Sequence, residues 1–185
     1  RTAWSFLRLT RGGNSKPMKV TTTLGFVLGL LILGTGSNAF AHARNVGLGV
    51  AIGGTYSPTQ LNTIDVGSGF GWGFFVDIPL LDTFVISPAA MLRESNFGGG
   101  KRPVTDIDLN FKFIVPMGKM KLGVGVLGGI TSADKFYGHY GALGYWSIQA
   151  VSNLDIFLLG QYKQTLHQTK QIDDLHIYAG GMFRF

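Results

Sequence analysis

The segment 175–185 alternates between apolar and polar side chains, and this alternation limits the possible folds more than any other feature of the chain. In an extended strand, successive side chains point to opposite faces. One face would carry Leu175, Ile177, Ala179, Phe183 and Phe185, and the other His176, Tyr178 and Arg184. The first face suits lipid and the second a polar interior, although a strand packed on a soluble core can alternate in the same way.

Seven further segments alternate in the same manner: 46–56, 70–78, 84–93, 106–115, 121–130, 139–150 and 156–163. The clearest is 106–115, where charged and polar residues alternate with aromatic and aliphatic ones, a period that a helix does not show. Pro88 weakens the segment 84–93, because proline cannot donate to a ladder. The segment 156–163 is apolar on both faces at its start, so we orient it with Gln161 and Lys163 toward the interior.

The connections between these segments also alternate in length. Short turns are predicted at 80–82, 116–119 and 151–153, and longer polar loops at 57–69, 94–105, 131–138 and 164–174. An even number of antiparallel strands can close without leaving an edge exposed to lipid. We therefore predict an all-β fold, an eight-stranded antiparallel up-and-down transmembrane β-barrel. Short turns belong on the periplasmic side, so both mature termini are expected in the periplasm of a Gram-negative bacterium.

The beginning of the chain has the three parts of a cleavable signal peptide. Met18-Lys19 supplies a basic start, Leu24 to Leu33 a short apolar stretch, and Gly36 to Ala41 a small-residue cleavage site. The apolar stretch is about half as long as a membrane-spanning helix needs. The alternatives are an uncleaved anchor or a buried helix. We expect an upstream segment at 1–17 that is not part of the mature protein, a signal peptide at 18–41 and the barrel at 42–185.

The net charge of +6 belongs mostly to this N-terminal part of the chain. Five of the sixteen basic residues, and none of the ten acidic ones, precede residue 42. The expected mature part is therefore nearly neutral, and binding to nucleic acid, which needs a retained basic surface, is not predicted. The absence of cysteine fits a compartment where no disulfide is used, although it decides little.

The predicted mature region resembles the small eight-stranded outer-membrane barrels of the OmpX type and of the OmpA transmembrane type. Its ending, Ala179-Gly180-Gly181-Met182-Phe183-Arg184-Phe185, is similar to their closing Gly-x-Gly-Tyr-Arg-Phe pattern, with Met182-Phe183 as a departure. The resemblance implies that the barrel assembly machinery recognises the terminal aromatic residues, so Phe185 and Phe183 are the candidate assembly signal. It implies a location in the outer membrane, with outer-membrane lipid and lipopolysaccharide as surroundings, and says little about individual function.

Charged residues at inward positions are the first candidate site. We predict a polar network in the lumen that comprises Arg93, Asp106, Asp108, Lys112, Lys163, His176 and Arg184. Arg93 and Asp106 are expected to pair across two neighbouring strands. Such a network would fill the lumen and fix the strand register, because eight strands leave an interior just wide enough for side chains. The alternative is a selectivity lining for a pore.

Two further sets of residues are candidates for contact with the membrane. Outward aromatic side chains that would anchor at headgroup depth are Tyr56, Trp72, Tyr140, Trp146 and Tyr162. Ligand stacking is the alternative for these rings. Lys101 and Arg102 lie in a predicted outer loop and are candidates for contact with lipopolysaccharide phosphates. The alternative is a basic loop tip that contacts only solvent.

No catalytic, cofactor or metal motif is found in the sequence. His139-Tyr140-Gly141 faintly resembles the His-x-Ser element of lipid A deacylases, but glycine stands at the serine position. No cofactor is predicted. Three functions remain open: a non-enzymatic surface barrel with a structural, binding or adhesion role through four outer loops; a narrow channel for ions or small solutes; and a lipid A-modifying enzyme. The sequence does not identify an extracellular ligand.

Overall fold

The computed structural model describes residues 46–61, 64–95, 101–133, 135–166 and 171–185. All of them belong to one compact unit, residues 39–185. The predicted upstream segment 1–17 and signal peptide 18–41 lie outside the described residues. Among the residues described, no helix is long and apolar enough to cross a membrane.

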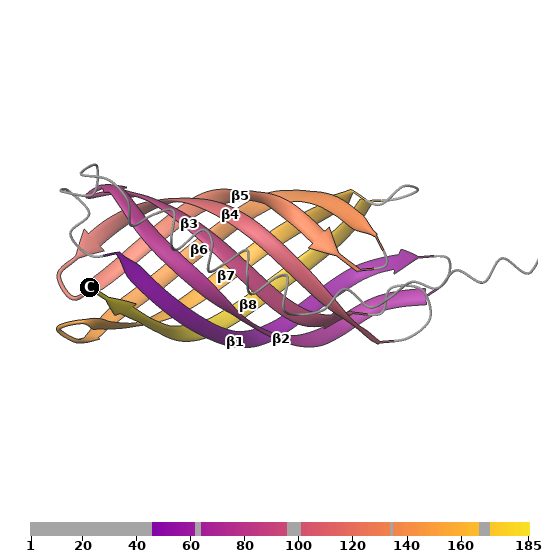
Figure 1. Ribbon diagram of the computed structural model, residues 1–185, viewed down its shortest axis with the longest axis horizontal. Helices are drawn as coiled ribbons and strands as arrows, with labels where there is room; N and C mark the ends of the chain where they lie inside the picture. Colours follow the sequence, from indigo (N-terminus) through magenta and orange to yellow (C-terminus); the bar gives the residue numbers. More distant parts are fainter. Residues whose placement is uncertain (1–45, 62–63, 96–100, 134, 167–170) are drawn as a thin grey trace, which may run out of the picture. The chain divides into compact units, whose positions relative to one another are not determined.

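Eight antiparallel strands form a closed barrel in which each strand pairs with its neighbours in the sequence (Figure 1). The strands are β1 (Gly47–Leu61), β2 (Ile64–Leu81), β3 (Phe84–Ser95), β4 (Arg102–Met117), β5 (Met120–Ser132), β6 (Phe136–Val151), β7 (Leu154–Leu166) and β8 (Gln171–Arg184). The barrel closes where β8 pairs with β1, from Gly47 opposite Arg184 to Tyr56 opposite Leu175. The predicted eight-stranded antiparallel up-and-down barrel is confirmed.

At one end of the barrel, which we call the turn end, the connections are short, as predicted. β2 and β3 are joined by 82–83, β4 and β5 by 118–119, and β6 and β7 by 152–153. Gly118 has a φ of 66°, a left-handed conformation that glycine adopts without the strain of a Cβ atom. The start of β1 and the end of β8 lie at the same end (Figure 1).

The strands extend further at the opposite end, the loop end, than the sequence predicts. β1 runs to Leu61 and β2 begins at Ile64, so most of the loop predicted at 57–69 is strand. Likewise, half of the residues predicted as a loop at 94–105, and most of those at 131–138 and 164–174, belong to strands. The prediction was wrong because polar residues were taken to mark loops. Ser57 and Thr59 are polar but buried, and they continue the inward alternation of β1.

The alternation of faces follows the sequence pattern along every strand. Outward residues such as Val50, Ile52 and Val124 are 55–66% exposed, whereas inward residues such as Phe75 and Phe157 are 2% exposed. The interior is narrow enough that some positions accept only glycine. A Cβ atom at Gly141 would lie 1.9 Å from the carbonyl oxygen of Tyr162 on β7. Small inward residues therefore allow the strands to come together around side chains that fill the lumen.

Candidate functional site

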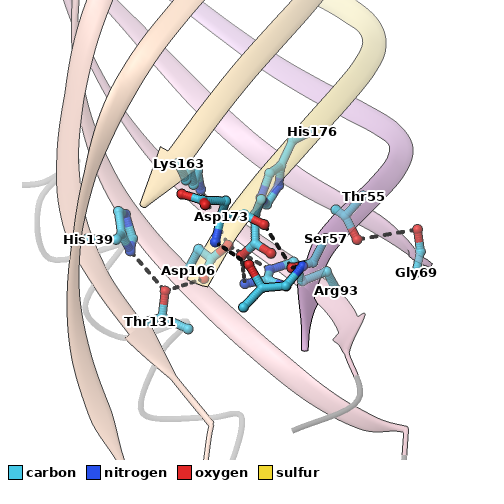
Figure 2. A network of polar contacts seen from close by, with 12 residues as sticks. Thr55, Ser57, Gly69, Arg93, Asp106, Thr131, His139, Lys163, Asp173 and His176 are labelled. Carbon is cyan, nitrogen blue, oxygen red and sulfur yellow. Dashed lines mark hydrogen bonds and ion pairs between the residues drawn. The ribbon is translucent and has the colours of Figure 1, made fainter. Parts of the chain in front are cut away.

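The lumen holds two groups of ion pairs, one toward each end of the barrel. The loop-end cluster consists of Arg93 (β3), Asp106 and Asp108 (β4), Thr131 (β5), His139 (β6), Lys163 (β7) and Asp174 (β8). Each stands at an inward position of its strand, so the period of two brings all seven side chains into the interior. All are at most 4% exposed. Figure 2 shows several of them converging from different strands.

Ion pairs connect the loop-end cluster across the lumen. Arg93 Nε lies 2.9 Å from Asp106 Oδ2, and its Nη2 lies 3.2 Å from Asp174 Oδ2. Lys163 Nζ lies 2.7 Å from Asp108 Oδ2 and 3.3 Å from Asp106 Oδ2. Each buried charge therefore has at least one partner of opposite sign, which offsets the large cost of removing it from water.

The Arg93–Asp106 contact crosses the β3–β4 ladder diagonally. In the register, Arg93 stands opposite Val104, and Asp106 stands opposite Met91. Diagonal neighbours are within reach of long side chains such as arginine. The pair that the sequence predicts from adjacency therefore forms by the reach of the guanidinium group across two residues.

His139 links three strands through its two ring nitrogens. Nδ1 lies 2.8 Å from Thr131 Oγ1, and Nε2 lies 2.7 Å from Asp108 Oδ1. The hydroxyl of Thr131 also lies 2.8 Å from Asp106 Oδ1 (Figure 2). A hydroxyl, an imidazole and a carboxylate in series resemble a hydrolase triad. Here, however, Thr131 is fully buried inside the barrel, and its hydroxyl is engaged by a second carboxylate.

The turn-end cluster is a separate group of charges. Lys112 on β4 donates to Asp77 on β2, and Arg184 on β8 donates to Asp155 on β7. Lys121 Nζ lies 2.9 Å from Asp155 Oδ2, so this carboxylate accepts from two cations. Arg184 Nη2 also lies 3.8 Å from Asp77 Oδ2 and so connects the two pairs.

Between the two clusters the lumen is filled by neutral and aromatic side chains. Asn110 Nδ2 donates to the carbonyl oxygen of Ser87 at 2.8 Å and Gln161 Nε2 donates to Asn110 Oδ1 at 3.2 Å. The ring of Phe157 packs edge-on against Phe75, with centroids 5.7 Å apart. These inward side chains are 0–2% exposed, so water does not reach this level of the described lumen.

The predicted lumen residues are all inward, but they do not form one network. Arg93, Asp106, Asp108 and Lys163 join the loop-end cluster; Lys112 and Arg184 join the turn-end cluster. Among the described contacts His176 is in neither set of ion pairs, and its Nδ1 lies 3.0 Å from the hydroxyl oxygen of Tyr178. The sequence predicted these residues from parity, that is, from the odd or even position of a residue along its strand. Parity tells which face of the sheet a side chain is on and does not specify its partner across the lumen.

Six participants were not among the predicted network: Asp77, Lys121, Thr131, His139, Asp155 and Asp174. The inward parity of Asp77 and His139 was visible in the sequence. Asp174 fell in a predicted loop, and Asp155 preceded the predicted start of its strand. Extending the alternation beyond the apolar core of each strand would have found both.

The five candidate girdle residues all face outward. The exposed fractions of Tyr56, Trp72, Tyr140, Trp146 and Tyr162 are 38–56%, and these rings lie in an outer face of apolar side chains. Tyr162 has a polar partner, because its hydroxyl donates to Asp173 Oδ1 at 2.9 Å. A ring with an apolar body and a hydrogen-bonded polar tip suits a boundary between lipid and water.

The remaining candidates are exposed at the two ends of the barrel. Phe183 and Phe185 follow one another on the outward side at the turn end, with ring centroids 5.0 Å apart. Lys101 and Arg102 are exposed where β4 begins at the loop end, as is Lys135 in the connection between β5 and β6. Among the described residues, no group of three or more metal-binding side chains is found.

A closed barrel of eight antiparallel strands, apolar outside and charged inside, has the fold of the small outer-membrane β-barrel proteins. The structure is similar to that of Neisserial surface protein A, with a TM-score of 0.56 and 14% sequence identity over 76% of this chain and 96% of that one. This likeness shows the fold. No protein family and no curated protein matches the sequence.

Two other solved barrels match with lower TM-scores. Ail, the attachment invasion locus protein of Yersinia pestis, is 10% identical, with a TM-score of 0.46 over 76% of this chain and 97% of Ail. The N-terminal β-barrel domain of OprF from Pseudomonas aeruginosa is 13% identical, with a TM-score of 0.41 over 75% of this chain and 97% of that domain.

Proposed function

We propose that this chain is a non-enzymatic outer-membrane protein of a Gram-negative bacterium, with a structural or surface-binding role that its four loop-end connections carry out. The observation that supports this most is the contrast between the two sides of its wall. The outer side is an apolar surface, and the inner side is a filled lumen with paired charges toward each end. The lumen of such a barrel is filled by side chains, so the connections at its loop end are the part that would bind a partner.

The proposed orientation places the turn end, with both barrel termini, in the periplasm and the loop end outside the cell. Short periplasmic turns and longer strands and loops on the outside are the usual arrangement in this class. The signal peptide proposed at 18–41 would direct export. Tyr56, Trp72, Tyr140, Trp146 and Tyr162 would anchor the barrel in the lipid.

Two partners follow from this placement. Lys101 and Arg102 are exposed at the loop end, where their cationic groups would meet lipopolysaccharide phosphates. Phe183 and Phe185 form an exposed aromatic pair at the turn end, where the barrel assembly machinery would recognise them during insertion.

The absence of cysteine permits a direct test of this proposal. Single cysteines are introduced at Lys101 (K101C) and, as the matched control, at Lys119 (K119C) in the turn between β4 and β5. Whole cells are treated with a membrane-impermeant maleimide, and outer-membrane fractions are compared boiled and unboiled on a gel. We expect a heat-modifiable band in the outer membrane, labelled at position 101 and not at 119. Labelling only at 119 would reverse the orientation, and a soluble protein would refute the proposal.

A narrow channel is the second candidate, because both ends of the lumen carry charges that an ion would meet. The plugged middle of the lumen argues for the first candidate, and conductance in a planar bilayer decides between them. A lipid A-modifying enzyme is the third candidate. The Thr131–His139–Asp108 series is its only structural support among the described residues, and mass spectrometry of lipid A with and without the gene tests it.

A further inference from the structure

Four buried side chains at the loop end form an unbroken series of three short contacts. Asp106 Oδ1 lies 2.8 Å from Thr131 Oγ1, which lies 2.8 Å from His139 Nδ1; His139 Nε2 lies 2.7 Å from Asp108 Oδ1. The series begins and ends on β4 and passes through β5 and β6. Polar atoms at these distances are in hydrogen-bond contact, and each such contact needs one hydrogen between its two atoms.

The hydrogens available do not suffice if His139 is neutral. The hydroxyl of Thr131 supplies one, a neutral imidazole supplies one, and ionised carboxylates supply none. Three contacts therefore have two hydrogens, and one contact would bring two lone pairs together. Because all four side chains are at most 4% exposed, water does not relieve that repulsion.

We propose that this four-residue series holds one additional proton at neutral pH and that His139 carries it as an imidazolium ion. Nδ1–H then donates to Thr131, Nε2–H donates to Asp108, and the hydroxyl of Thr131 donates to Asp106. All three contacts become charge-assisted or fully satisfied. His139 is in this way a structural cation and not a catalytic base.

The charges around His139 support this placement. The facing groups from other strands are Asp106 and Asp108 on β4, Lys163 on β7, Arg93 on β3, and Asp174 and His176 on β8. Without His139, these strands contribute three carboxylates and two permanent cations to the cluster. An imidazolium ion at position 139 makes the number of positive charges equal to the number of negative charges, and a dry interior favours that balance.

Loss of this proton would loosen one part of the barrel and not the rest. Thr131 and His139 stand on either side of the β5–β6 connection, which includes the exposed Lys135. Without the additional proton, one of the three contacts that hold β4, β5 and β6 together becomes repulsive. The turn-end cluster contains no part of this series. The additional proton thus helps to hold β4, β5 and β6 together at the loop end.

Nitrogen NMR of the full-length protein folded in detergent micelles, with ¹⁵N-labelled histidine, tests the protonation state directly. The variants H139Q and H176N assign the signals among the four histidines. We expect both ring nitrogens of His139 to carry hydrogen at pH 7. A singly protonated ring of His139 in the unaltered protein would overturn the proposal.

Discussion

Arg93 and Asp174 form an ion pair across the lumen, with 3.2 Å between Nη2 and Oδ2, although 81 residues separate them and their strands are not neighbours in the sheet. Most contacts in a barrel join adjacent strands. This one connects β3 directly to β8 through the interior. Because Arg93 also binds Asp106 on β4, its guanidinium group holds three strands at once.

Removal of the guanidinium group should therefore be costly. Arg93→Met leaves Asp106 and Asp174 buried with less compensation, and we expect the free energy of unfolding to fall by about 3–5 kcal/mol. Asp174→Asn is the milder change, because Arg93 keeps its contact with Asp106. Equilibrium unfolding in urea, in detergent or lipid, measures both. Equal losses for the two variants would show that Arg93 does not act as the shared partner.

The Asp77–Lys112 pair at the turn end should show strong coupling. Lys112→Met alone leaves a buried carboxylate with only the more distant Arg184, and Asp77→Leu alone leaves a buried ammonium group. The double variant removes both charges and should be more stable than Lys112→Met, by about 1–3 kcal/mol. A double-mutant cycle in urea gives this value, and additive losses would contradict it.

The tightness of the wall predicts opposite outcomes at two glycines of β6. Gly141→Ala places a Cβ atom against the carbonyl oxygen of Tyr162 and should destabilise the barrel by about 1–3 kcal/mol or prevent folding. Gly144→Ala is the matched control, since a Cβ atom there has no heavy atom within 4 Å. Its free energy of unfolding should change by less than about 0.5 kcal/mol. Heat-modifiability on a gel and urea unfolding give the comparison.

The outward face should tolerate charge according to depth in the membrane. Val124 lies in the middle of β5 and is 66% exposed, whereas Val151 ends β6 at the turn end and is 55% exposed. In a bilayer, Val124→Arg should cost about 2–4 kcal/mol, and Val151→Arg about 0–1 kcal/mol. Unfolding from lipid vesicles measures the difference. Similar small effects at both positions would indicate that this face is exposed to water.

Phe185 should matter for assembly and not for the stability of the finished barrel. Its side chain is 72% exposed, so Phe185→Ala removes little packing. We expect a change of less than about 0.5 kcal/mol in the free energy of unfolding and a clear fall in the amount of folded protein in the outer membrane of cells. Leu81→Ala, at a side chain that is 67% exposed, is the control and should leave that amount unchanged. An equal fall for both variants would refute a specific recognition role.

The fold could be predicted because inward and outward side chains differ in polarity with a period of two along the strands. The segment 156–163 begins with a run of apolar residues, and its polar residues Gln161 and Lys163 were enough to orient it correctly. The ends of the strands were harder, because Ser57 and Asp174 are polar whether they lie in a loop or point into a polar lumen. Parity gives the direction of a side chain and not the length of the strand.

The partners within the lumen could not be predicted in the same way. Arg93 and Asp174 meet only because the sheet curves until its first and last strands pair, and the register of all the ladders together fixes which side chains reach the same level. A sequence read strand by strand shows the pair Arg93–Asp106, which two neighbouring strands define. The series through Thr131 and His139 needs three strands in register.

The pairing of β8 with both β7 and β1 has a consequence for how the protein folds. Until β8 is in place, β1 and β7 each have a row of unpaired backbone groups, and these are costly wherever water is scarce. A partly formed sheet therefore gains little from lipid, and the contacts that complete it join the most distant parts of the barrel sequence. Folding should be slow and strongly cooperative, because the last strand to join determines whether the first one is stable.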